Sequence, residues 1–238
     1  MHSRLADQDR KQRVTLLAGI ALASVLLWQT ALGSLLLYPF TILATWFHEM
    51  GHGLAAMATG RGFERLLIFA DGSGVAESMR PAGGYRLTDA LVAASGPLGP
   101  GLAGALLIVA SRSPTATRNA LAALGVALVL STLIWVRSPT GWLVLPALGL
   151  MIGALALRGS PSWQRFALQL LGVQAAIGAW RQFDYLFSPG GNVDGRIHRS
   201  DTGAIADVLL LPHWVWGAII SAAILLLLWG SLRLAFRR

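Results

Sequence analysis

Long apolar runs recur along the whole chain, and they limit its fold more than any other feature. Of the 238 residues, 55% are hydrophobic and only 13% are charged, whereas a soluble domain carries roughly 25% charged residues. A helix that crosses a bilayer needs about 20 mostly apolar residues, and several segments satisfy this. The sequence therefore predicts an all-α polytopic membrane protein, with residues 1–238 forming a single domain embedded in the lipid bilayer.

We predict seven transmembrane helices, with boundaries that are loose by several residues. Six helices are an alternative, because the first segment is short and the fourth and fifth nearly touch. Pro39 falls early in the second segment, where it should kink the helix or mark its start. The predicted segments are 14–29, 34–58, 88–110, 119–136, 140–157, 164–187 and 208–232.

The distribution of Arg and Lys indicates an orientation. If the N-terminus lies inside and seven helices alternate, 12 of the 19 cations fall in inner segments and 7 in outer ones. Cytoplasmic segments carry the excess of cations, so we expect a cytoplasmic N-terminus, in a bacterial plasma (inner) membrane. Seven helices would leave the last three arginines outside, which runs against the same rule.

Two compositional facts exclude whole classes of function. The net charge of +8 comes without interleaved aromatic and basic residues, so we expect contact with anionic lipid headgroups and no nucleic acid. The chain has no cysteine. A disulfide framework and a thiolate metal site are therefore impossible, and a metal would have to bind His, Asp, Glu or backbone oxygen.

Three ionisable residues, His48, Glu49 and His52, interrupt the second apolar segment in the stretch TWFHEMGHGLAA. Residues four apart share one helix face, so the two imidazoles can bind one ion while Glu49 lies beside it. This HExxH pattern is typical of two zinc ligands and a general base. The alternative is that both histidines hydrogen-bond to neighbouring helices and Glu49 is half exposed at the membrane surface.

A β-hairpin is predicted between the second and third segments. Residues 66–69 and 75–78 have extended patterns and flank the turn sequence DGSG at 71–74. Glycine-rich turns of this kind join hairpin strands, although an ordinary loop is the alternative, with Asp71 as a turn residue.

The motif HEMGH within a membrane helix resembles the site-2 proteases, a family of intramembrane zinc metalloproteases. Residues 94–98 (ASGPL) are similar to that family's Ala-Gly-Pro-Leu segment, although Pro100 stands where the family usually has Asn. Residues 172–174 (GVQ) and 200–202 (SDT) most resemble a compact bacterial and plant branch. The resemblance extends over about residues 35–220. It implies that the 63–79 hairpin presents an edge strand to an unfolded substrate.

A catalytic zinc needs a third protein ligand as well as an open position. The family uses Asp in a Leu-Asp-Gly segment, which is absent here. Asp201 matches the branch pattern and is the preferred ligand, with Asp184 and then Asp194 as alternatives. Asp201 could instead be an N-cap, and Asp184 could instead pair with Arg181.

Four further polar residues were considered for the same site. Gln169, Gln174 and Gln182 could orient the metal ligands, but interhelical hydrogen bonds are the favoured interpretation. His198 is expected in a loop with no metal role.

The motif and the resemblance together predict an intramembrane zinc endopeptidase of the site-2 protease type, acting in regulated intramembrane proteolysis. One Zn²⁺ would bind His48, His52 and Asp201, and Glu49 would act as general base on a membrane protein or peptide substrate. A non-catalytic zinc-binding protein, either a pseudoprotease or a metal carrier, is the alternative, although a pure binder does not need Glu49. A zinc transporter should show acidic residues or histidines along several segments, and here they gather near one end.

Overall fold

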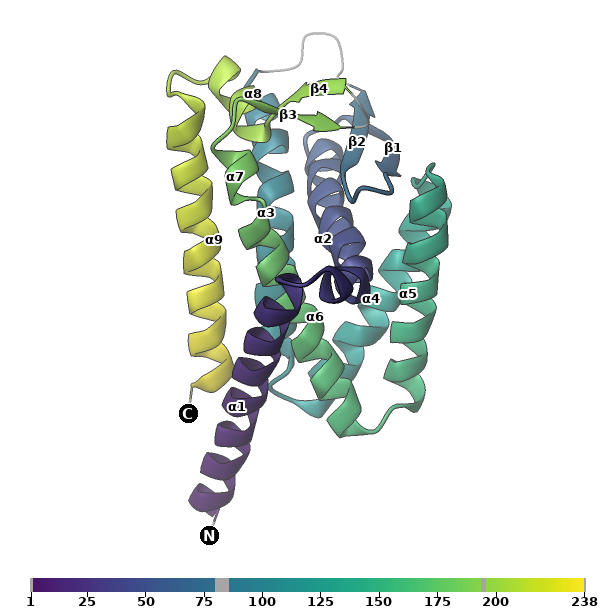
Figure 1. Cartoon of the computed structure of the whole chain (residues 1–238), viewed down its shortest axis with the longest axis vertical. Coiled ribbons are helices and arrows are strands. Elements are labelled where there is room, and N and C mark those ends of the chain that lie inside the picture. Colours follow the sequence, from purple (N-terminus) through teal and green to yellow (C-terminus); the bar gives the residue numbers. More distant parts are fainter. Residues whose placement is uncertain (1, 80–85, 194–195, 238) are drawn as a thin grey trace.

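The computed structural model describes residues 2–79, 86–193 and 196–237, which form a helical bundle with two small hairpins (Figure 1). The helices are α1 (His2–Trp28), α2 (Ala31–Ala58), α3 (Arg86–Ala110), α4 (Pro114–Ile134), α5 (Pro139–Arg158), α6 (Pro161–Arg181), α7 (Phe183–Leu186), α8 (Asp201–Val208) and α9 (His213–Phe236). The antiparallel hairpins are β1 (Gly62–Ile68) with β2 (Gly74–Met79) and β3 (Gly190–Val193) with β4 (Arg196–Arg199).

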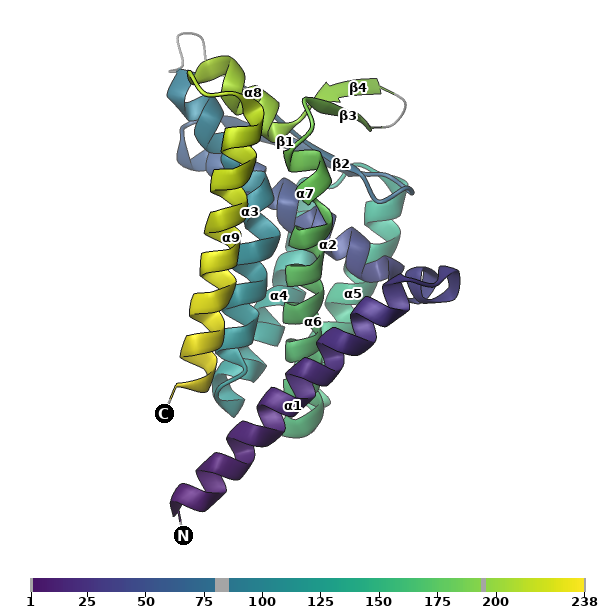
Figure 2. The ribbon, with the colours of Figure 1, turned by 60° about the vertical axis from the view of Figure 1, so that its left-hand side comes forward.

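The bundle has two distinct ends. Both hairpins and α8 lie at one end, which we call the hairpin end, and both termini lie at the other (Figures 1 and 2). Helix α2 starts about halfway along the bundle, where α1 ends, and continues to the hairpin end (Figure 2). Helix α3 packs against α2, α6, α8 and α9 and so connects both halves of the molecule.

The predicted count of seven transmembrane helices is not confirmed. Among the described residues, five helices (α2, α3, α4, α5 and α9) are long and apolar enough to cross a membrane. The apolar part of α1, Val14–Trp28, is shorter, and α6 buries the polar side chains of Gln164, Gln169 and Gln174. Helices α1 and α2 together run once along the bundle, from the end with the termini to the hairpin end (Figure 2). Because both termini lie at the same end, the chain runs along the bundle an even number of times, whereas seven alternating helices would give an odd number.

The predicted hairpin between the second and third segments is confirmed, with slightly longer strands. Its turn contains Gly72 at φ 89°, a left-handed conformation that glycine adopts without strain. The outer edge of β1 is covered, since the Leu66 amide donates to Trp135 O at 2.9 Å and Leu66 O accepts from the Arg137 amide at 3.0 Å. No other strand pairs with β2 within the described part of the chain, so β2 is an edge strand.

The β3–β4 hairpin was not predicted. His198 was expected in a loop, and no strand was predicted around it. Each strand is only four residues long, and the glycines at 190 and 191 give no alternation of apolar and polar side chains. A pattern of period two cannot be recognised over so few residues.

Glycines let α2 and α3 approach very closely. A Cβ at Gly51 would lie 2.4 Å from Ser95 O, and a Cβ at Gly99 would lie 2.3 Å from Phe47 O. Small residues at such crossings let helix backbones meet in a membrane. Pro39 lies inside α2 and does not mark its start, because Thr30 caps the helix by accepting a hydrogen bond from the Gly33 amide at 3.0 Å.

Candidate metal centre

Helix α2 presents both histidines of the HExxH motif on one face, as the spacing predicts. The Nε2 atoms of His48 and His52 lie 3.1 Å apart, and the two rings meet edge to face. Only 8% of His48 and 5% of Glu49 is exposed. The predicted alternative, in which Glu49 is half exposed, is therefore wrong.

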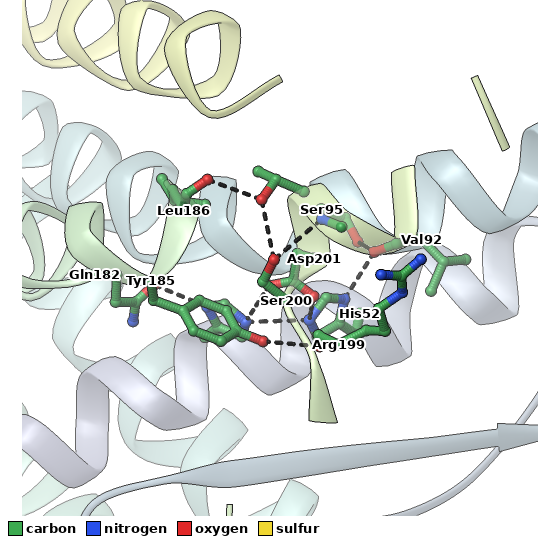
Figure 3. A network of polar contacts seen from close by, with 12 residues as sticks. His52, Val92, Ser95, Gln182, Tyr185, Leu186, Arg199, Ser200 and Asp201 are labelled. Carbon is green, nitrogen blue, oxygen red and sulfur yellow. Dashed lines mark hydrogen bonds and ion pairs between the residues drawn. The ribbon is translucent and has the colours of Figure 1, made fainter. Parts of the chain in front are cut away.

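Asp201, the first residue of α8, reaches the same point from a distant part of the sequence. Its carboxylate oxygens lie 3.1 Å from His48 Nε2 and 3.2 Å from His52 Nε2. One ligand atom from each of the three residues lies within 4.8 Å of the others, as the close-up shows for His52 and Asp201 (Figure 3). This group could bind a metal ion.

The hydrogen bonds on the far side of each imidazole fix which ring nitrogen faces this group. His52 Nδ1 lies 2.7 Å from Val92 O. A carbonyl oxygen only accepts, so Nδ1 carries the hydrogen and the lone pair is on Nε2. His48 Nδ1 lies 2.8 Å from Gln182 Oε1, which gives the same tautomer. Metal-binding histidines are oriented in this way.

The three converging atoms fit a divalent cation. Two imidazole lone pairs and a carboxylate face one another, and Asp201 Oδ2 is buried without a hydrogen-bond donor among the described residues. A tetrahedral zinc site with bonds of about 2.0–2.1 Å places its ligand atoms about 3.3 Å apart, close to the observed 3.1–3.2 Å.

Asp201 is not the N-cap of α8, the other role that the sequence suggested for it. Ser200 is the cap, because its Oγ accepts from the Gly203 amide at 3.1 Å. The side chain of Asp201 can therefore point toward the histidines rather than toward its own helix.

Strand β2 passes directly over Glu49. A Cβ at Gly74 would lie 2.9 Å from Glu49 Cγ and 3.0 Å from its Oε1, so only glycine permits this approach. The backbone of Ala76 also lies close to the Glu49 carboxylate. Glu49 is thus held between α2 and the edge strand, next to the three candidate ligands.

Two cavities border the site. They have volumes of about 220 and 260 Å³, and His48, Glu49, Gly74 and Tyr185 line both. A third cavity of about 190 Å³ adjoins the first through Thr45, Gly72 and Gln182. The remaining residues around the first cavity are Thr45, Gly72, Ser73, Gln182 and Gly191. Those around the second are His52, Arg61, Val75, Ala76, Asp89, Val92, Ala93, His198, Arg199 and Asp201.

The other candidate aspartates do not join the group. Asp184 is exposed on α7 and lies outside the cluster that could hold a metal. Its suggested partner Arg181 stacks on the Trp28 ring, 3.8 Å from the ring centroid. Asp194 lies outside the described residues. His198 is on β4 rather than in a loop and borders the second cavity.

Two of the three glutamines divide between the predicted roles, whereas both amide atoms of the buried Gln169 lack a hydrogen-bond partner among the described residues, so the interhelical bond expected for it is wrong. Gln174 makes the expected interhelical bonds, accepting from Trp28 Nε1 at 3.3 Å and donating to Ser24 Oγ at 3.0 Å. Gln182 instead accepts from His48, so the favoured interpretation was wrong for this residue. Tyr185 lines both site cavities and was missed, since no spacing in the sequence connects it with the HExxH motif.

Comparison with known proteins identifies the family. A sequence model described as peptidase M50B-like matches residues 17–231. The chain belongs to this family. The match confirms the resemblance to the site-2 proteases, and with the apolar helices it makes the chain an integral membrane protein of a metallopeptidase family. The narrower resemblance to a bacterial and plant branch stays a prediction. No curated protein and no solved structure gave a significant match.

Proposed function

We propose that this protein is a zinc endopeptidase that hydrolyses peptide bonds of membrane-associated proteins within the membrane. The observation that carries the proposal is the convergence of His48, His52 and Asp201 beside the buried carboxylate of Glu49. Such an arrangement of three ligands and an adjacent base matches catalytic zinc sites, which keep a fourth position open.

Each residue has a definite role in this proposal. The Nε2 atoms of His48 and His52 and the carboxylate of Asp201 would hold the ion. Bound there, zinc would polarise the scissile carbonyl and lower the pKa of water. Glu49 takes the proton of the attacking water and passes it to the leaving amine.

The edge strand β2 is the proposed docking site for the substrate backbone. A transmembrane helix hides its carbonyls in hydrogen bonds, so a substrate must unwind before hydrolysis. An unwound segment can pair with an exposed strand edge, and β2 lies against Glu49 at Gly74 and Ala76. Pairing there would bring a substrate carbonyl to the catalytic residues and offset part of the cost of unwinding. Cleavage after such unwinding would suit regulated intramembrane proteolysis.

The proposed location is a bacterial plasma membrane with a cytoplasmic N-terminus. The end with the termini includes the start of α1, two helix connections and the end of α9, and ten described cationic residues lie on these segments, against six toward the hairpin end. The ten are Arg4, Arg10, Lys11, Arg13, Arg112, Arg118, Arg158, Arg165, Arg233 and Arg237, and the six are Arg61, Arg65, Arg86, Arg137, Arg196 and Arg199. Arg181 lies about halfway along the bundle, next to Trp28 at the end of α1.

This orientation places the site toward the non-cytoplasmic side. Seven alternating helices, as predicted from the sequence, would instead have put the N-terminus and the HExxH motif on the same side. The absence of cysteine makes the point testable with two single-cysteine variants at exposed positions, Glu64→Cys on β1 and Arg112→Cys after α3. A membrane-impermeant maleimide should label the first in intact cells and the second only after lysis. The reverse pattern would place the site on the cytoplasmic side.

The decisive experiment separates a protease from a non-catalytic zinc-binding protein. Purified wild type should contain zinc and cleave a model membrane substrate in vesicles. Glu49→Gln should retain zinc and lose at least about 100-fold in rate, the lower range for a general base. Glu64→Gln is the matched control, because Glu64 is an exposed glutamate on β1 rather than on the proposed docking strand. Cleavage that survives Glu49→Gln would refute the proposed base.

A further inference from the structure

Buried hydroxyl groups flank Asp201 on both sides along the chain. Ser200 Oγ donates to Ser188 O at 2.6 Å, and Thr202 Oγ1 donates to Leu186 O at 2.8 Å. Neither Ser200 nor Thr202 has any exposed surface. Buried polar groups with good partners hold their geometry, because breaking such a bond leaves a desolvated group unpaired.

The acceptors belong to one short element, α7, and the residues that follow it. The last carbonyls of a helix have no partner inside the helix, and Thr202 satisfies that of Leu186, the last residue of α7, while Ser200 satisfies the carbonyl of Ser188 in the segment that follows. Gln182, the residue before α7, holds His48 through its side chain. The segment 182–188 therefore contacts His48 of α2 directly and also contacts the two residues that flank Asp201 of α8 (Figure 3).

Further bonds connect the same two segments. The Tyr185 hydroxyl donates to Arg199 O at 3.3 Å, and the Ser200 amide donates to Pro189 O at 3.3 Å. In the β3–β4 hairpin, Gly190 pairs with Arg199. The backbone just before Asp201 is therefore attached to the 185–190 segment at several points.

We propose that Thr202 and Ser200 are positioning residues, which hold the Asp201 carboxylate against the two imidazoles by anchoring it to the α7 segment. The inference rests on the proposed function, since it requires Asp201 to bind the metal. In α2, the helical spacing of four residues by itself brings the two histidines to one face. Asp201 has no such local support, and its position relative to His48 depends on these bonds.

Zinc affinity of the full-length protein in detergent tests this, measured by competition with a chromophoric chelator. Thr202→Val keeps the side-chain shape but removes the hydroxyl, and it should weaken zinc binding about 10-fold, the lower range for loss of a partner that orients a ligand. Thr202→Ser should restore wild-type affinity. The matched control is Thr132→Val in α4, since Thr132 is also buried and donates to a backbone carbonyl, Leu128 O, at 2.7 Å.

The outcomes distinguish the inference from the proposed function. If wild type binds zinc and Thr202→Val binds it equally well, Thr202 is only structural and the inference is overturned. If wild type binds no zinc, the proposed function fails as well. If Thr202→Val does not fold, Ser200→Ala provides the same test, because it removes the bond to Ser188 O on the other side of Asp201. Unchanged affinity in that variant would equally overturn the inference.

Discussion

Helices α2 and α8 supply the candidate ligands in two different ways. Helix α2 has 28 residues and a largely buried second half, and it carries both histidines and Glu49. Helix α8 has 8 residues and carries one carboxylate at its first position. The α2 part of the site depends on the regular geometry of a helix. The α8 part depends on tertiary hydrogen bonds, so its position should be more sensitive to distant substitutions.

The largest expected effect comes from the ligand on α8 itself. Asp201→Asn removes a charged ligand and should weaken zinc binding by at least ~100-fold, above the usual range for residues that only orient a ligand. Asp184→Asn, on the exposed face of α7, should leave the affinity unchanged. Chelator competition on both variants checks the assignment. If Asp184→Asn loses zinc and Asp201→Asn keeps it, the third ligand is Asp184 rather than Asp201.

The second largest effect is expected from a residue of α3 that packs against His52 of α2. A Cβ at Gly96 would lie 2.1 Å from His52 Nε2, so Gly96→Ala should displace the imidazole and weaken zinc binding by roughly 10–100-fold. Overpacking should also destabilise the fold by about 1–3 kcal/mol.

Gly153→Ala in α5 is the control for this substitution, because nothing lies within 4 Å of its Cβ position. It should leave zinc affinity unchanged. Zinc affinity together with the thermal midpoint measures both effects. Normal zinc binding in Gly96→Ala would show that the close contact of α3 does not hold His52 in place.

The smallest effect is expected from Gln182, which lies just before α7 and contacts His48 of α2. Gln182→Ala removes the acceptor for His48 Nδ1 and should weaken zinc binding about 10-fold. Gln174→Ala removes only interhelical bonds to α1, and such bonds average about 0.6 kcal/mol in a membrane protein. It should lower stability slightly without changing zinc affinity. Equal zinc affinities in the two variants would contradict the role of Gln182.

The sequence predicted those features that depend on neighbouring residues. The spacing of His48 and His52, the glycine turn at 71–74 and most of the apolar helices follow from patterns within one or two turns of the chain. The β3–β4 hairpin was missed because its strands are too short to show a pattern. The orienting role of Gln182 was only the less favoured alternative and Tyr185 was missed, because each depends on a contact with a different element.

The sequence by itself determined that this is a membrane protein with two imidazoles and a carboxylate on one helix, because bilayer thickness and helical periodicity act locally. Only the tertiary structure decided that Asp201 rather than Asp184 meets those imidazoles, and that the site lies at the end away from both termini. The physical reason is that such positions depend on close helix packing and on buried hydrogen bonds between segments far apart in the chain.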